Sequence, residues 1–83
     1  MSDTITIRVS SFASGCLRGV LCERIADVER HRRVAGHLYT QEGAEATETV
    51  LRQMRECLTA VEDARLAYVG LTRDDPRAKV LLA

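Results

Sequence analysis

The stretch that decides the fold runs from Thr40 to Val69 and reads TQEGAEATETVLRQMRECLTAVEDARLAYV. Mostly apolar or small side chains recur at intervals of three and four, which is the spacing of one face of an α-helix. The residues of this stripe are Ala44, Thr47, Leu51, Met54, Leu58, Val61, Arg65 and Tyr68. No proline interrupts the pattern, and Thr40 is suited to cap its first turn. We therefore predict a helix over residues 41–69 that packs against another helix.

A second helical pattern precedes this stretch and covers residues 12–38, with Ser10 and Ser11 suited to begin it. Its main stripe consists of Leu17, Leu21, Arg24, Val28, His31, Ala35 and Leu38. Because only a short connection separates the two patterns, the helices should be antiparallel neighbours. The chain is thus expected to be mainly α, built on an antiparallel two-helix hairpin.

Residues 4–9 read TITIRV and alternate strictly between polar and apolar side chains, with Ile5, Ile7 and Val9 on one face. This alternation and the β-branched residues predict a short N-terminal β-strand. A lone strand leaves its backbone groups unpaired and needs a second one. Its mate is either the apolar run at residues 80–82 or the same strand of a second subunit.

The end of the chain carries turn signals. Gly70 is a candidate cap for the C-terminus of the long helix. Asp75 before Pro76 can begin a last short turn. Residues 70–83 are therefore predicted to form a C-terminal turn and tail of one single domain over residues 1–83. A chain of 83 residues is near the size at which one core becomes marginal without a partner.

The apolar residues exceed what one hairpin can cover. Val50, Cys57 and Ala64 flank the main stripe of the second helix, and both termini add further aliphatic side chains. A monomer of this size cannot bury all of them against itself. We therefore expect a homodimer or higher homo-oligomer in which hairpins combine into a helical bundle.

Composition restricts the partners. Twelve basic and twelve acidic residues cancel, so nucleic acid is not the expected partner and another protein is. Three cysteines, an odd number, argue against a disulfide framework and for reduced, mostly buried thiols in a cytoplasmic protein. No apolar run suits a signal peptide or a membrane span, so no membrane partner is expected. The cysteine and histidine spacings do not suit a metal, and no cofactor is expected.

Polar residues on the apolar stripes are the first candidates for an interaction site. Arg24, His31 and Arg65 occupy positions that should face a partner helix. Each then needs a carboxylate, an anionic ligand or an escape to the rim of the bundle. Local pairing of Asp27 with Arg24 and of Glu62 with Arg65 is possible at their spacing. Two interpretations stay open. In one, the arginine side chains extend along apolar surface so that their charged ends reach the edge of the bundle. In the other, the polar residues form a layer that fixes the register of the helices.

Small residues form a further line on the first helix, and Gly15 and Gly19 belong to it. A glycine inside a helix costs about 1 kcal/mol relative to alanine. The line is either a surface that another backbone approaches closely or a tolerated feature of a long helix.

The basic cluster of residues 30–33 is completed by His37, and Arg30, Arg33 and His37 share the outer face of the first helix. Cations at this place interact favourably with the negative end of a helix. Arg32 and His37 also give an Arg-x-x-x-x-His spacing, which resembles the ribonuclease motif of the HEPN domain.

The TITIRV segment resembles the N-terminal strand of ribbon-helix-helix repressors, in which paired strands enter the major groove and alternate polar residues read bases. That resemblance implies a DNA-binding transcriptional regulator as the alternative function. No catalytic triad, phosphate-binding loop or paired acids stand out, so we expect no enzyme and no catalytic residue. The leading hypothesis is a small non-enzymatic protein–protein interaction module, acting as a dimeric adaptor, regulatory subunit or inhibitor, such as a phage-encoded inhibitor of a host system.

Overall fold

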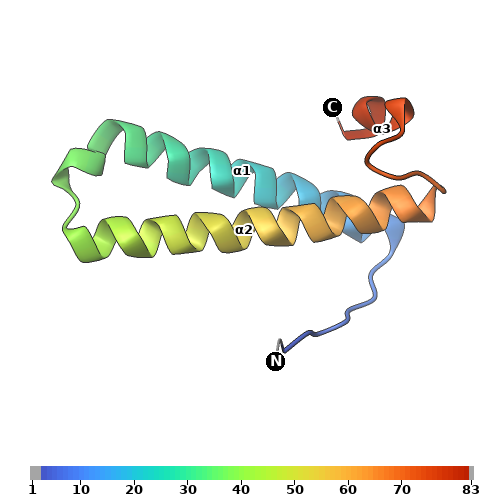
Figure 1. Cartoon of the computed structure of the whole chain (residues 1–83), viewed down its shortest axis with the longest axis horizontal. Coiled ribbons are helices and arrows are strands. Elements are labelled where there is room, and N and C mark those ends of the chain that lie inside the picture. Colours follow the sequence, from blue (N-terminus) through green and yellow to red (C-terminus); the bar gives the residue numbers. More distant parts are fainter. Residues whose placement is uncertain (1–2, 83) are drawn as a thin grey trace.

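The computed structural model describes residues 3–82 and consists of two long antiparallel helices followed by a short third helix (Figure 1). The elements are α1 (Ser11–Ala35), the 3-10 turn η1 (Gly36–Leu38), α2 (Gln41–Tyr68) and α3 (Pro76–Leu82). Because α1 and α2 pack along each other, the predicted mainly α helical hairpin is confirmed. α1 ends three residues before the predicted Leu38, where the backbone tightens into η1, and α2 ends one residue before the predicted Val69.

Side-chain caps explain where the two long helices begin. Ser10 Oγ accepts a hydrogen bond from the Ala13 backbone N–H at 3.0 Å, and Thr40 Oγ1 accepts one from Gly43 N–H at 3.0 Å. Each cap satisfies a backbone donor that has no partner inside its helix. The end of α1 at Ala35 and the cap at Thr40 place the turn of the hairpin between residues 35 and 41.

The C-terminal end of α2 is closed by a Schellman motif. Gly70 has a φ of 76°, a left-handed conformation that glycine adopts without steric cost. The Gly70 N–H donates to Ala67 O at 3.0 Å, and the Leu71 N–H donates to Leu66 O at 2.8 Å. The reversal directs the chain back along the hairpin toward α3.

α3 folds back onto the end of the hairpin. Asp75 Oδ1 accepts a hydrogen bond from the Arg77 backbone N–H at 2.9 Å, and Pro76 occupies the first helical position. Ala78 of α3 is fully buried against α2. Since residues 80–82 belong to α3, they are not the mate of the predicted N-terminal strand.

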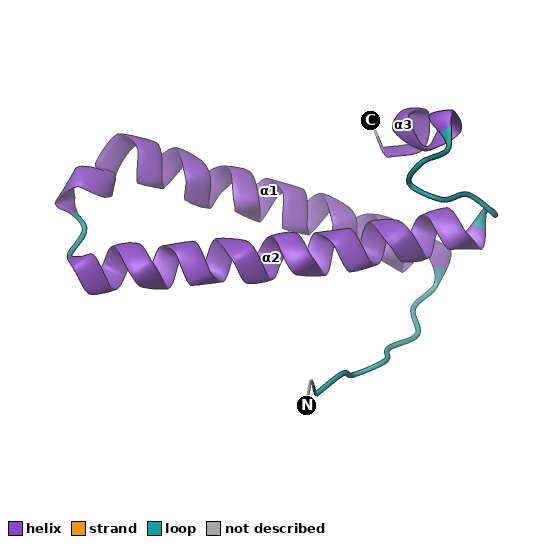
Figure 2. Cartoon of the chain, in the orientation of Figure 1, coloured by secondary structure: helices purple, strands orange, loops and turns teal. Residues whose placement is uncertain are grey.

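Residues 3–10 form an extended segment, and no strand occurs among residues 3–82 (Figure 2). The side chains of Ile5, Ile7 and Val9 are all exposed. No backbone–backbone hydrogen bond involves residues 3–9 within the described part of the chain. The strand over residues 4–9 and its pairing with a second subunit remain predictions.

The core is small. Its buried side chains are Ile25, Leu51, Leu66 and Ala78. Leu51 lies on the predicted stripe of α2, but the buried Leu66 does not, and Tyr68 of that stripe is exposed. The predicted stripe of α1 is also wrong in part. Arg24, His31 and Leu38 are exposed, and the buried residue of α1 is Ile25. α1 is rotated so that Arg18 and Arg32 approach α2, where each meets a carboxylate.

The cysteines differ from expectation, because Cys16 and Cys57 are exposed and only Cys22 is half-buried; all three are unpaired thiols. Over residues 3–82, none of the helices is long and apolar enough to cross a membrane.

Candidate functional site

The most distinctive surface lies where the N-terminal end of α1, the C-terminal end of α2 and α3 come together, which we call the open end of the hairpin (Figure 1). A groove of about 660 Å³ is found there. It is lined by Ile7, Arg8, Val9, Ser11, Ser14, Ala64, Arg65, Tyr68, Val69 and Leu81. The N-terminal segment, both long helices and α3 therefore all contribute to one concave and mainly apolar surface.

Large apolar side chains gather around this groove. Tyr68 and Val69 are exposed at the end of α2 and line the groove, and Phe12, the single phenylalanine of the chain, is 84% exposed in the first turn of α1. Ile5 is 85% exposed and, unlike Ile7 and Val9, does not line the groove. An exposed, mainly apolar groove on a small chain is typical of an interaction site.

Arg65 forms the polar wall of the groove and is one of the residues singled out from the sequence. Its Nη1 atom donates to Ser14 Oγ at 2.8 Å and to the Ser11 carbonyl oxygen at 3.1 Å. The guanidinium thus crosses from α2 to the first turn of α1. The expected local pair with Glu62 is wrong, because Arg65 uses its donors on α1 instead.

Gly15 has a structural reason to be glycine. A Cβ atom at this position would lie 3.1 Å from Arg65 Nη1, closer than side-chain carbons usually approach a neighbour. The approach that the sequence suggested is therefore made by a side chain of the same hairpin. Gly19, on the same line of small residues, has open space around it, with nothing within 4 Å of an added Cβ.

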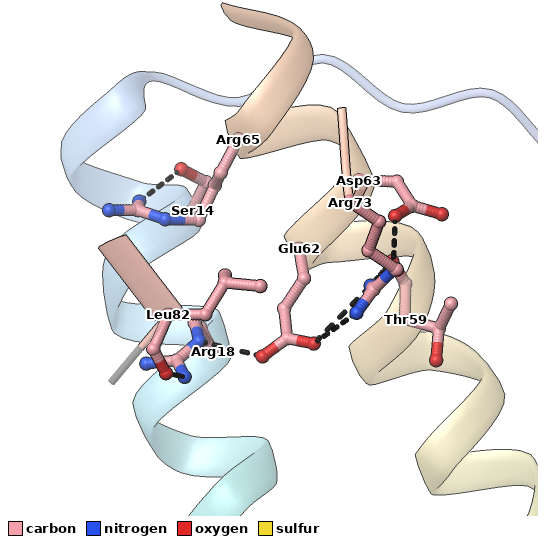
Figure 3. A network of polar contacts seen from close by, with 8 residues as sticks. All are labelled: Ser14, Arg18, Thr59, Glu62, Asp63, Arg65, Arg73 and Leu82. Carbon is pink, nitrogen blue, oxygen red and sulfur yellow. Dashed lines mark hydrogen bonds and ion pairs between the residues drawn. The ribbon is translucent and has the colours of Figure 1, made fainter. Parts of the chain in front are cut away.

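Glu62 is the centre of a polar network that fixes the open end (Figure 3). Its Oε2 atom accepts from Arg18 Nε at 2.9 Å, and its Oε1 atom accepts from Arg73 Nη2 at 3.4 Å. A second donor of Arg18 reaches the Leu82 carbonyl oxygen at the end of α3. The Glu62 carboxylate therefore joins α2 to α1 and to the loop before α3, and Arg18 extends the network to α3.

Arg73 closes this network from the loop between α2 and α3. Its Nε donates to Asp63 Oδ1 at 2.8 Å, and its Nη2 donates to the Thr59 carbonyl oxygen at 3.2 Å. The hydrogen bond to Asp63, followed by the nearby Glu62, raises the pKa of the Arg73 guanidinium above its ordinary value. Arg73 stays charged, and its contacts hold the loop against α2.

The other end of the hairpin carries a second, smaller cavity of about 390 Å³ between α1 and α2. It is lined by Arg24, Asp27, Val28, His31, Tyr39 and Thr47. His31 and Tyr39 stack with ring centroids 5.8 Å apart, and His31 Nδ1 lies 2.5 Å from the Tyr39 hydroxyl. Asp27 pairs with Arg30, so the expected local pair of Asp27 with Arg24 is wrong.

The basic cluster of α1 does not form one site. Arg33 and His37 are exposed at the end of α1 and in η1, and Arg30 is engaged by Asp27 on the helix surface. Arg32 Nη1 donates to Glu48 Oε2 of α2 at 2.5 Å, which directs Arg32 across the hairpin. The arginine of the Arg-x-x-x-x-His spacing, Arg32, is therefore engaged in an ion pair with Glu48.

The candidate residues from the sequence thus fall into three places. Gly15 and Arg65 meet at the open end, Arg24 and His31 line the smaller cavity, and the remaining ones lie on the outer surface. Sequence reasoning missed the groove itself, because its lining comes from three stretches that are far apart in the chain, within residues 7–14, residues 64–69 and Leu81. The exposed Tyr68 and Leu81 gave no local signal that they would share a surface with Ile7.

Among residues 3–82, no three histidine, cysteine or acidic side chains are grouped so that they could hold a metal ion. The chain matches no protein-family model, no curated protein and no solved structure. The surface described above is therefore the basis on which a function can be inferred.

Proposed function

We infer that this protein is a small non-enzymatic interaction module that works as a homodimer and binds another protein, as an adaptor, regulatory subunit or inhibitor. The observation that supports this most directly is the amount of surface that one chain leaves exposed. Five of the large exposed apolar side chains, those of Ile7, Val9, Tyr68, Val69 and Leu81, line the groove.

The exposed area can be compared with that of an ordinary monomer. The chain has an accessible surface of 6732 Å², whereas a compact monomer of 9.2 kDa has about 4,900 Å². The radius of gyration of 15.3 Å likewise exceeds the value of about 12 Å for a compact domain of this length. Two copies carry an excess of about 3,600 Å², within the ~2,000–5,000 Å² range that obligate homodimers bury.

The charged side chains support recognition through apolar contacts. Most arginines are engaged by partners within the hairpin, for example Arg18 by Glu62, Arg32 by Glu48 and Arg55 by Glu29. Few cations are therefore free to bind a polyanion, and the chain has no net charge. The open end presents the large uncovered apolar surface, which suits a protein partner.

The test is sedimentation equilibrium of the purified protein at micromolar concentration. We expect a mass of at least twice 9.2 kDa. A single species of 9.2 kDa across the concentration range would contradict the proposal, because the uncovered surface would then be a property of a stable monomer.

A transcriptional regulator that resembles ribbon-helix-helix repressors is the second candidate. It is favoured by the alternation of residues 4–9, in which Thr4, Thr6 and Arg8 share the face opposite the apolar one. In that family the first helix is short and a glycine-containing turn follows it, whereas α1 has 25 residues. The neutral charge also disfavours DNA, so we rank this function second.

A further inference from the structure

We propose that the groove at the open end is filled by the N-terminal segment of a second copy, with Ile5 of that copy as the side chain that enters it. This inference rests on the dimer proposed above and specifies its contact surface and register. Among residues 3–82, Ile5 is the most exposed of the large apolar side chains.

Ile5 has no place in its own chain. Ile7 and Val9 lie on the same face of the segment and line the groove, but Ile5 does not reach it. The groove itself stays open, although its walls carry Tyr68, Val69 and Leu81. One copy therefore has both an apolar side chain without a cavity and a cavity without a filling side chain.

The backbone of the segment is also incomplete. Residues 3–9 are extended and make no backbone–backbone hydrogen bond within the described chain. β-branched residues fill five of positions 4–9, which favours a strand. An antiparallel partner strand would satisfy these donors and acceptors, and a two-fold axis between two copies supplies one.

The register of such a pair follows from the alternation of side chains. Directly opposite residues in an antiparallel pair point to the same face. The apolar residues Ile5, Ile7 and Val9 all have odd numbers, so their faces coincide only where the numbers of two opposite residues add up to an even total. With Ile7 opposite Ile7, Ile5 lies opposite Val9 of the second copy, and every apolar residue is matched.

The neighbouring even registers are worse. With Arg8 opposite Arg8, two like charges meet on one face, and Ile5 lies opposite Ser11, which already belongs to α1. With Thr6 opposite Thr6, Val9 lies opposite Asp3, an acidic residue. The structure therefore selects the register in which Ile7 sits on the two-fold axis.

This register brings Ile5 to the groove of the other copy. Val9 lines the groove, and its directly opposite neighbour has a Cβ atom about 4.5–5.5 Å away. Ile5 of each copy thus enters the groove of the other, and the exchange is reciprocal, as a two-fold interface requires. The alternate face of the ribbon carries Thr4, Thr6 and Arg8, of which Arg8 also lines the groove.

Disulfide trapping tests the register in a background in which the native cysteines are replaced by C16S, C22A and C57S. On mild oxidation we expect I7C to cross-link with itself, because the two side chains are directly opposite. I5C should not cross-link with itself, because the Ile5 residues of the two copies are separated by four positions along the ribbon, which is about 14 Å. Mixing I5C chains with tagged V9C chains should give a cross-linked heterodimer.

The occupancy of the groove is tested by two adjacent residues of α3. Leu81 lines the groove and Val80 does not, and both are exposed in the single chain. L81D should raise the dimer Kd at least about tenfold because it places a charge in an apolar contact, whereas V80D should change it less than about twofold. Circular dichroism of both variants checks that α1 and α2 remain folded.

The outcomes separate this inference from the proposed function. If the wild-type protein is a dimer but I7C fails to cross-link, or L81D and V80D have equal effects, the groove and register assigned here are wrong and the dimer stands. If the wild-type protein is a monomer, the proposed function fails first. Cross-linking of I5C with itself would assign a different register.

Discussion

Arg18 and Glu62 join α1 to α2 through an ion pair in which Arg18 Nε lies 2.9 Å from Glu62 Oε2. Their side chains are 24% and 13% exposed, less than those of any other pair between the two long helices. Partial burial reduces the screening of such a pair by water. Because Glu62 also accepts from Arg73, the pair contributes to the docking of the loop and α3 as well as to the hairpin.

Replacing Glu62 by glutamine should therefore destabilise the protein. E62Q leaves the Arg18 guanidinium half-buried with a weaker acceptor, and we expect the free energy of unfolding to fall by about 1–3 kcal/mol. Urea denaturation followed by circular dichroism measures this change. The matched control is E48Q, which loses the exposed pair with Arg32 and should cost at most about 1 kcal/mol. Equal losses in the two variants would contradict the special role of Glu62.

The two glycines of α1 should respond differently to alanine. Gly19 has free space around it, so G19A should stabilise the protein by about 1 kcal/mol through helix propensity. G15A gains the same propensity but pushes against Arg65 Nη1, so its stability should lie below that of G19A. Thermal unfolding of both variants measures the difference, and the double variant G15A/R65A should recover the gain. A larger gain for G15A than for G19A would show that Arg65 yields without cost.

The limits of the helices could be read from the sequence because their signals are local. Thr40 caps α2 and Gly70 closes it, and each acts through hydrogen bonds to residues no more than five positions away. Asp75 and Pro76 likewise mark the start of α3, where Asp75 accepts a hydrogen bond from the Arg77 backbone N–H. The end of α1 was placed too late, because the 3-10 turn at Gly36 continues the helical spacing without an obvious stop.

The facing side of α1 could not be read in the same way. Leu21 and Val28 belong to either of two neighbouring stripes, one with Arg24 and His31 and the other with Ile25 and Arg18. Which stripe turns inward depends on α2, where Glu62 and Glu48 receive Arg18 and Arg32. Those contacts join residues 16 and 44 positions apart, beyond any local pattern. The groove was missed for the same reason.

Substitutions of a buried and of an exposed leucine also test the rotation of α1. Leu51 is fully buried, so L51A should reduce the free energy of unfolding by about 2–5 kcal/mol through lost burial and a cavity. Leu38 lies on the stripe expected from the sequence but is 75% exposed, so L38A should cost less than about 0.5 kcal/mol. Chemical denaturation of the two variants separates them. A large loss of unfolding free energy in L38A would instead support the stripe of the first helix that the sequence predicted.

The cap of α3 should depend on pH. The hydrogen bond from the Arg77 side chain, and then the one from its backbone N–H, lower the pKa of Asp75 below the ordinary value of 3.8. A pKa lowered by folding means that the stabilising effect is fully present above pH 3.8 and is lost as the pH falls through the lower, folded value. Side-chain NMR titration should show this low pKa, with α3 amides shifting in parallel. In D75N those shifts should be absent, and an Asp75 pKa above 3.8 would contradict the cap.

The last prediction separates the two candidate functions. If residues 4–9 read DNA, Arg8 contributes to binding, and the complex weakens steeply with salt because each neutralised phosphate releases counterions. If the chain is a protein-binding module, the same segment only completes the dimer. We expect no shift of duplex DNA in a mobility assay at physiological salt with up to about 10 µM protein, a concentration at which non-specific binders with Kd of about 10⁻⁶ M would shift it. R8A should behave like the wild-type protein in this assay, because there is no DNA affinity to lose. A sequence-selective shift that R8A abolishes, while the dimer persists, would make the DNA-binding regulator the first choice.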